Sequence, residues 1–286
     1  MGKDNDIWLI LKGFFLAFFI LFFFYPLVLV LFKSFALNTP TISGFLTLLV
    51  SNKQIIWNSF YQASVSTLFA VLIGIPAAFL IARREFPGKK LVKALSLIPF
   101  VFPSILVVVS FVIIFGNNGW INNFLQDFLF FETHIQFLYG FSGIILAHVF
   151  YNFPIVMRFV SSSWENLDVT MKEASKTLGA NKLQTFFRVT LPQLAPSILA
   201  SASLVFIFTF MSFAIVLSLG GLQFSTLEVE IFRQILRKLD FGAGAMLALF
   251  QFLALSVFAL IYYYFSKNQI KEKVNLEKPS KLNFNS

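Results

Sequence analysis

The chain has 286 residues, of which 58% are hydrophobic and only 12% are charged. A water-soluble globule could not hide so much apolar surface, so this balance excludes a soluble enzyme or binding domain and predicts an all-α integral membrane protein. The chain has no Cys, which excludes a disulfide framework and a thiolate metal site, and its net charge of +9 suits either nucleic acid or a membrane surface.

Six apolar stretches are long enough to cross a bilayer as transmembrane helices. They cover residues 8–32, 60–82, 95–115, 141–160, 196–219 and 243–265. The first stretch shows no small-residue cleavage site, so we interpret it as a spanning helix rather than a signal peptide. A short amphipathic piece that begins at Trp120 is expected to lie flat at the interface, and the Lys- and Asn-rich tail 266–286 has the composition of a disordered segment.

The distribution of Lys and Arg orients these spans. Seventeen of the 22 lie in four segments: the N-terminus up to Lys12, residues 83–93, residues 158–188 and the tail. Positive residues accumulate on the cytoplasmic side of a membrane. We therefore expect a cytoplasmic N-terminus, a cytoplasmic tail and a cytoplasmic loop at residues 161–195, and the positive charge is explained by the membrane rather than by nucleic acid.

The loop at residues 161–195, here called the polar loop, is the longest water-compatible stretch between spans. Its central sequence, EASKTLGANKLQTFFRVTLP at 173–192, carries apolar side chains at helical spacing on both sides of Gly179. Gly179 suits the left-handed conformation that ends a helix, and Pro192 and Pro196 are expected to end the second helix. The pattern predicts a helix, a tight turn and a second short helix. Taken alone, the pattern also fits an amphipathic helix that merely lies on the surface. It fits a DNA-binding helix-turn-helix as well, although a position between two membrane spans argues against that function.

The order of residues in the polar loop resembles the ATPase-coupling loop of bacterial ABC importer permeases. The matching residues are Glu173, Ala174, Ser175, Leu178, Gly179, Ala180, Phe186, Leu191 and Pro192. Ser175 stands where that pattern usually has Ala. Four further segments, LIPFVFPSIL from 97, ILAHVFYNFP from 145, FMSFAIVLSLGG from 210 and STLEVEIFRQI from 225, resemble the branch that imports thiamine or iron(III).

The resemblance implies a MetI-like transmembrane domain over residues 1–265, in the bacterial inner membrane. It implies that a dimer of separate ATPase subunits binds and hydrolyses ATP, so this chain needs no cofactor of its own. A second permease half, either another copy of this chain or a related permease, completes the pathway, and a periplasmic or lipid-anchored binding protein delivers the substrate. Thiamine or iron(III) is the expected substrate, with a polyamine or a sulfate- or molybdate-like anion as the alternative. Permeases of this branch usually carry two fused halves, whereas this chain carries one.

Polar residues inside the spans form a second candidate site. His148 and Asn152 are four residues apart and share a helix face. Together with Ser201, Thr209 and Ser212 of the fifth span they either line the translocation path or hold the helices together by hydrogen bonds. Both interpretations stay open at this point.

An intramembrane enzyme and a passive channel are the competing classes. The sequence has no His-Glu-x-x-His, no Gly-x-Ser-x-Gly, no paired Asp within the spans and no phosphate-binding Gly-rich loop. No catalytic residue and no metal site are therefore expected, and a passive channel would have no use for a docking loop.

Overall fold

The computed structural model describes residues 2–26, 28–29, 32, 42–96, 98–129, 136–221 and 224–276. All of its regular structure in these ranges is helical. The helices are α1 (Gly2–Phe19), α3 (Ile42–Ser51), α4 (Lys53–Arg83), α5 (Lys89–Leu95), α6 (Ile98–Val101), α7 (Ser104–Phe115), α8 (Trp120–Leu129), α9 (Phe141–Glu165), α10 (Val169–Thr177), α11 (Lys182–Thr185), α12 (Leu191–Phe210), α13 (Ala214–Leu219), α14 (Leu227–Phe232) and α15 (Phe241–Leu276). Three π-helical segments join some of them: η1 (Ile20–Phe24), η2 (Phe186–Thr190) and η3 (Arg233–Arg237).

Five helical stretches among the described residues are long and apolar enough to cross a membrane. They are Lys53–Arg83, Ser104–Asp127, Phe141–Glu165, Lys182–Phe210 and Phe241–Lys267. The stretch expected at 8–32 contains a shorter apolar helix, Ile10–Phe24, and residues 27, 30 and 31 of that stretch lie outside the described residues. The chain is therefore an all-helical, multi-pass membrane protein, and five of the six expected spans have a counterpart of membrane length.

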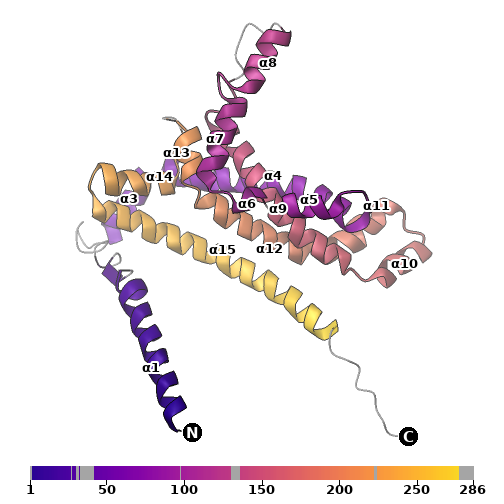
Figure 1. Ribbon diagram of the computed structural model, residues 1–286, viewed down its shortest axis with the longest axis horizontal. Coiled ribbons are helices and arrows are strands. Elements are labelled where there is room, and N and C mark those ends of the chain that lie inside the picture. Colours follow the sequence, from indigo (N-terminus) through magenta and orange to yellow (C-terminus); the bar gives the residue numbers. More distant parts are fainter. Residues whose placement is uncertain are drawn as a thin grey trace. The chain divides into compact units, whose positions relative to one another are not determined.

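The third span differs from the expected 95–115. It begins at Ser104, because Pro103 takes an extended conformation and separates α7 from α6. The amphipathic helix α8 continues outward from α7 (Figure 1), so that Ser104–Asp127 forms one membrane-length stretch; a position flat at the membrane interface stays a prediction. Two hydrogen bonds to the carbonyl oxygen of Gly116 hold the turn between the two helices. The backbone N–H of Gly119 and the side-chain Nδ2 of Asn122 each donate to it at 2.8 Å.

Contacts divide the chain into two compact units: unit 1 comprises Met1–Ile56 and Thr226–Leu253, and unit 2 comprises Trp57–Ser225 and Ala254–Ser286. In unit 1, the carboxylate of Glu230 on α14 is buried. It accepts a hydrogen bond from Gln234 Nε2 at 2.9 Å and pairs with Lys238 at 3.2 Å and Arg233 at 3.8 Å. Two cations and one amide donor thus compensate a carboxylate that would be costly to bury alone.

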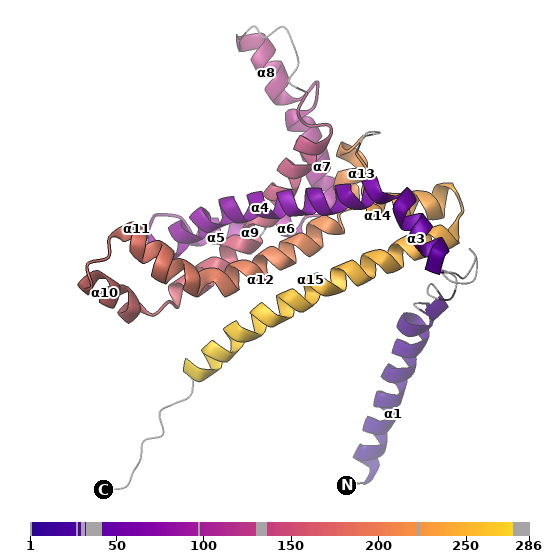
Figure 2. The ribbon, with the colours of Figure 1, turned by 180° about the vertical axis from the view of Figure 1, so that it is seen from behind.

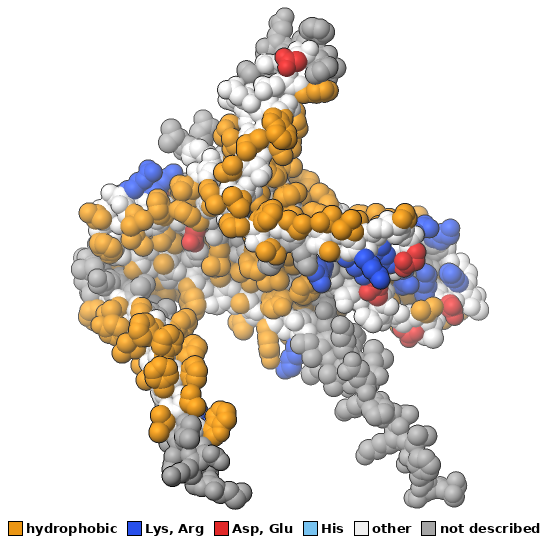
Figure 3. All heavy atoms as spheres, viewed as in Figure 1, with side chains coloured by type: hydrophobic (Ala, Val, Ile, Leu, Met, Phe, Trp, Pro, Cys, Tyr) orange, Lys and Arg blue, Asp and Glu red, His pale blue; other side chains and the backbone are white. Residues whose placement is uncertain are grey.

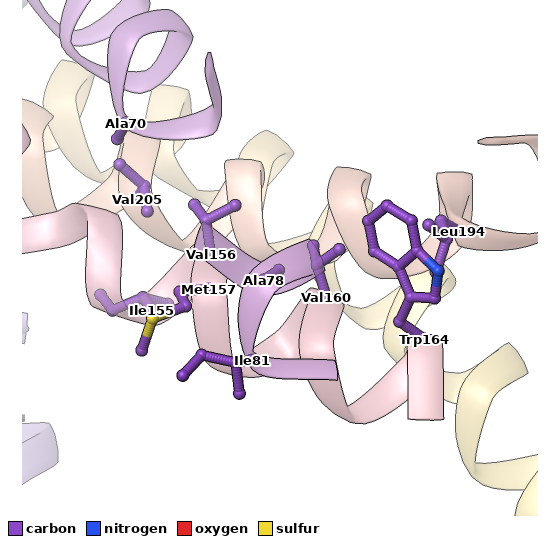
Figure 4. Packing of buried hydrophobic residues seen from close by; sticks show 10 residues of the cluster. All are labelled: Ala70, Ala78, Ile81, Ile155, Val156, Met157, Val160, Trp164, Leu194 and Val205. Atoms are coloured by element: carbon purple, nitrogen blue, oxygen red, sulfur yellow. The ribbon is translucent and has the colours of Figure 1, made fainter. Parts of the chain in front are cut away.

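The core of unit 2 lies between α4, α9 and α12. Figure 1 shows α9 and α12 side by side, and Figure 2 shows α4 running along them. The buried side chains form a row from Ala70 and Val205 at one end to Trp164 and Leu194 at the other (Figure 4). Gly74 lets α4 approach α9 closely, since a Cβ there would lie 2.6 Å from the Cβ of Val156.

The fifth span is interrupted. The sequence predicts one span over 196–219, but α12 ends at Phe210, and α13 starts at Ala214 after a three-residue break. The break is stabilised from α4, because Gln62 Nε2 donates to the carbonyl oxygen of Thr209 at 2.8 Å, beside a longer bond from the Ser212 N–H at 3.3 Å. At the other end of the chain, α15 runs on to Leu276 and so enters the expected tail, whose residues 277–286 lie outside the described residues.

Candidate functional site

The polar loop begins with a capped helix. Asp168 precedes α10, and its Oδ1 accepts hydrogen bonds from the Thr170 hydroxyl at 2.7 Å and the Thr170 backbone N–H at 2.8 Å. These two hydrogen bonds hold the pKa of Asp168 below its usual value. The cap is therefore ionised at neutral pH, at the helix end that favours negative charge.

The predicted tight turn is present at Gly179. Its φ is +81°, in the left-handed region, and a Cβ at this position would meet nothing within 4 Å. Its N–H donates to Lys176 O at 2.9 Å, and the N–H of Ala180 donates to Ser175 O at 3.0 Å. This pair of bonds closes the end of α10 as a Schellman motif. Glycine is thus required here by backbone conformation, not by lack of space.

The second helix starts from a reciprocal cap and then does not stop where the prolines predicted. Asn181 Oδ1 accepts from Gln184 N at 2.8 Å, and Gln184 Oε1 accepts from Asn181 N at 2.9 Å. From Lys182 the chain stays helical through α11, η2 and α12 to Phe210. The expectation that Pro192 ends this helix is wrong. A π-helical turn precedes Pro192, with Leu191 N–H bonded to Phe186 O, and this wider turn accommodates the proline ring and its missing N–H.

Ser175, the residue that departs from the family pattern, ties the two helices of the loop together. Its Oγ lies 3.1 Å from the Oγ1 of Thr185, which is buried, and it also donates to Lys172 O at 2.8 Å. The sequence alone shows only that Ser replaces the usual Ala at this position. The structure instead shows a cross-link over the turn between residues ten positions apart.

Aromatic rings attach the polar loop to the core of unit 2. Phe186 stacks on Trp164 of α9, and the two ring centroids are 6.2 Å apart. The centroids of Trp164 and Phe79 of α4 are 5.4 Å apart. Trp164 is buried beside Leu194 of α12 (Figure 4). The pattern in the sequence pointed to Phe186 but gave no signal for Trp164 or Phe79, because their contact with it depends on how three helices pack.

The outer surface of the polar loop is apolar and rimmed by charge. Leu178 and Leu183 are 87% and 69% exposed, and Met171 and Phe187 are also exposed. Glu173 is exposed and forms no ion pair with any described residue. Figure 3 shows Lys and Arg side chains gathered over the end of unit 2 that carries α10 and α11. Large apolar side chains in a charged surround are the composition of a protein-docking surface.

A pocket with a mixed polar and apolar lining opens beside the loop. It has a volume of about 1480 Å³ and lies between the end of α9, α10 and the start of α12. Its walls carry charges of both signs, from Lys93, Arg158, Glu165 and Asp168. Among the described residues no group of three or more His, Asp or Glu could hold a metal ion.

The polar residues of the spans lie buried between the helices of unit 2. His148 Nδ1 lies 3.1 Å from Ser66 Oγ on α4, and Asn152 Nδ2 donates to His148 O at 2.8 Å. The carbonyl oxygen of Thr209 accepts the hydrogen bond from Gln62 described above. Ser201 is buried, and its hydroxyl donates to the carbonyl oxygen of Ile198 in the same helix.

The structure therefore brings His148 and Asn152 together but shows no contact between them and Ser201, Thr209 or Ser212 in the part of the chain it describes. Ser212 is only half-buried, at the break between α12 and α13. His148 Nε2 and Asn152 Oδ1 are buried and have no partner among the described residues. The bond to Ser66 is an interhelical link of the kind that holds bundles together. A role in the translocation path stays a prediction.

These features define a multi-pass membrane protein whose polar loop packs on the core of unit 2. The chain belongs to the family of binding-protein-dependent transport system inner membrane components, which it matches over residues 70–271. Members of this family are permease subunits of ABC importers, and the chain is accordingly a transporter component and not an enzyme.

Individual relatives carry different substrate names. The chain is 32% identical over 213 residues to the thiamine transport system permease protein ThiP of Haemophilus influenzae, which covers 74% of this chain and 38% of the relative. It is 31% identical over 203 residues to the probable sulfate transport system permease protein cysT of Prototheca wickerhamii, over 70% of this chain and 78% of the relative. The match thus spans well under half of the length of the thiamine relative.

The fold has a close counterpart among solved structures. A bacterial alginate ABC transporter, in complex with a periplasmic protein bound to alginate pentasaccharide, superposes with a TM-score of 0.71 at 18% identity. The match covers 93% of this chain and 95% of that one. At this identity the likeness concerns the fold alone.

Proposed function

We propose that this chain is the permease subunit of a binding-protein-dependent importer in a bacterial inner membrane, and that its polar loop couples it to a separate ATPase. In this proposal six spans cross the membrane, and both termini and the polar loop are cytoplasmic. The single observation that carries the coupling role is the construction of the loop. Its exposed apolar surface is attached through Phe186 and Trp164 to the buried core, so force applied to the surface reaches the spans.

The partners follow from the same proposal. A dimer of ATPase subunits binds ATP and receives Leu178, Leu183 and their neighbours in a groove. Glu173 sits at the rim of this surface, where a basic residue of the ATPase would fix the register of docking more than it would add affinity. A second permease half, a copy or a relative, forms the other wall of the pathway. A periplasmic or lipid-anchored binding protein delivers the substrate. The alginate transporter of similar fold was solved in complex with an alginate-bound periplasmic protein.

Thiamine or iron(III) is the proposed substrate, supported by the similarity to thiamine permeases. The runner-up is a sulfate-like anion or a polyamine, because relatives with those names show comparable identity. Titration of the cognate binding protein with thiamine, ferric iron, sulfate and spermidine discriminates among them. If the binding protein bound only sulfate or only spermidine tightly, that ligand would replace thiamine or iron(III) as the proposed substrate.

Charge reversal at Glu173 tests the coupling role. The Glu173→Lys variant is expected to lower both association with the ATPase and substrate-stimulated ATP hydrolysis, since it places a positive charge against the proposed basic partner. Asp127→Lys is the matched control, because Asp127 is also an exposed acid but lies on α8, far from the loop in the sequence. Unchanged assembly and unchanged hydrolysis in Glu173→Lys would show that the loop does not couple through this surface.

A further inference from the structure

Residues 83–95, here called the basic segment, follow the membrane-length helix α4 and fold back in a fixed conformation. Gly88 has φ of +83° and precedes α5, and Val92 N–H donates to its carbonyl at 2.9 Å. Phe86 is partly buried against the core of unit 2, and its carbonyl accepts from Lys89 N–H. The basic segment is therefore a built element with a defined outer surface.

Helix α5 turns its charged face toward the protein and leaves its apolar face uncovered. Lys89 and Lys93, one helical turn apart, pair with Glu85 at 2.6 Å and with Glu165 of α9 at 2.9 Å. The opposite face carries Leu91 and Leu95, which are 60% and 49% exposed. A helix facing water would have the reverse arrangement. This orientation suits a helix whose apolar face enters the boundary between head groups and acyl chains.

Three cations of the basic segment stay unneutralised. Arg83, Arg84 and Lys90 are exposed, and no ion pair in the described part of the chain includes them. The acid nearest in sequence, Glu85, is already paired, and the hydrogen bond from Lys89 holds its pKa below the usual value. These cations lie at or just after the C-terminal end of the membrane-length helix α4, and Lys and Arg at such ends are typical of the cytoplasmic membrane surface.

We propose that the basic segment is a binding site for anionic phospholipid head groups. Arg83, Arg84 and Lys90 bind the phosphate groups, while Leu91 and Leu95 enter the acyl boundary. Each cation near an anionic surface strengthens binding about fivefold, and guanidinium groups add paired hydrogen bonds to phosphate oxygens. This site is separate from the coupling role of the polar loop and does not depend on it.

The test measures lipid retention by the purified full-length chain in mild detergent, by native mass spectrometry during titration with phosphatidylglycerol or phosphatidylcholine. The unaltered chain is expected to retain phosphatidylglycerol more tightly. The double variant R84Q/K90Q is expected to lose about 30-fold in affinity for phosphatidylglycerol, with little change for phosphatidylcholine. The variant R84K/K90R keeps the charges and should keep the preference.

The double variant K53Q/R237Q is the matched control, because it removes two exposed cations outside the basic segment. Thermal unfolding in the same detergent checks that all variants are folded. Equal retention of both lipids by the unaltered chain would overturn the proposal, as would an equal loss in K53Q/R237Q. Loss of ATPase association in R84Q/K90Q with the lipid preference intact would also overturn it, and would assign the surface to a protein partner.

Discussion

The turn at Gly179 offers the sharpest test of how the polar loop works. Replacing Gly179 by Ala adds only a methyl group, and that methyl meets nothing within 4 Å. The whole cost is therefore the left-handed backbone at φ of +81°, about 1–2 kcal/mol for a residue with a Cβ. If docking to the ATPase requires this turn, the affinity should fall about five- to thirty-fold, because the strain is relieved whenever the turn opens.

The assay is a titration of the purified permease with its ATPase, followed by substrate-stimulated hydrolysis. Gly179→Asn should lose less affinity than Gly179→Ala, since Asn tolerates the left-handed region better. Gly221→Ala is the matched control, because Gly221 also has positive φ (+62°) and open space but lies at the end of α13. The reasoning is refuted if Gly179→Ala binds the ATPase as well as the unaltered chain, or if Gly221→Ala weakens binding equally.

Three further predictions concern buried or capping groups. Ser175→Ala and Thr185→Val should each destabilise the polar loop by about 1 kcal/mol. A double-mutant cycle on amide-exchange protection should show that the two losses are not additive. Additive losses would mean that the two hydroxyls do not interact. Glu230→Ala should lower the stability of the chain in detergent by about 1–3 kcal/mol, because the buried amide of Gln234 loses its acceptor while the cation of Lys238 can still reach water. A thermal midpoint equal to that of the unaltered chain would argue against this network. The pKa of Asp168 is lowered in the folded loop, so its cap is fully present above the usual Asp pKa and is lost as pH falls through the lowered value. The protection factors of the amides at the start of α10, that is, their exchange rates relative to the unstructured chain at the same pH, should therefore fall on acidification and stay constant in Asp168→Asn.

The turn of the polar loop could be predicted because its determinants are local. A glycine after an amphipathic stripe marks a left-handed helix end, and Asn181 with Gln184 three residues later marks the next start. The continuation through Pro192 could not be predicted in the same way. Proline ends helices by rule, and the π-helical turn that accommodates it here has no signature in the sequence.

The break in the fifth span shows a second limit of local reasoning. No glycine or proline lies among Met211, Ser212 and Phe213, so the apolar run predicts an unbroken helix. What stabilises the break is Gln62, 147 positions away from the carbonyl it binds. The role of Ser175 cannot be predicted for the same reason, because its hydroxyl interacts with Thr185, which lies beyond the turn.

The unbroken helical path from the polar loop into the fifth span has a mechanical consequence. Lys182–Phe210 comprises 29 residues, so it is a rod roughly 44 Å long at about 1.5 Å per residue. Tilting such a rod by about 5° at its loop end displaces the other end by roughly 4 Å, which exceeds the width of a water molecule. The far end is the break at Met211–Phe213, the point where the backbone can bend and where Gln62 holds a single bond. A small rotation imposed at the loop would therefore be converted into a change of side-chain contacts at the other end of the span.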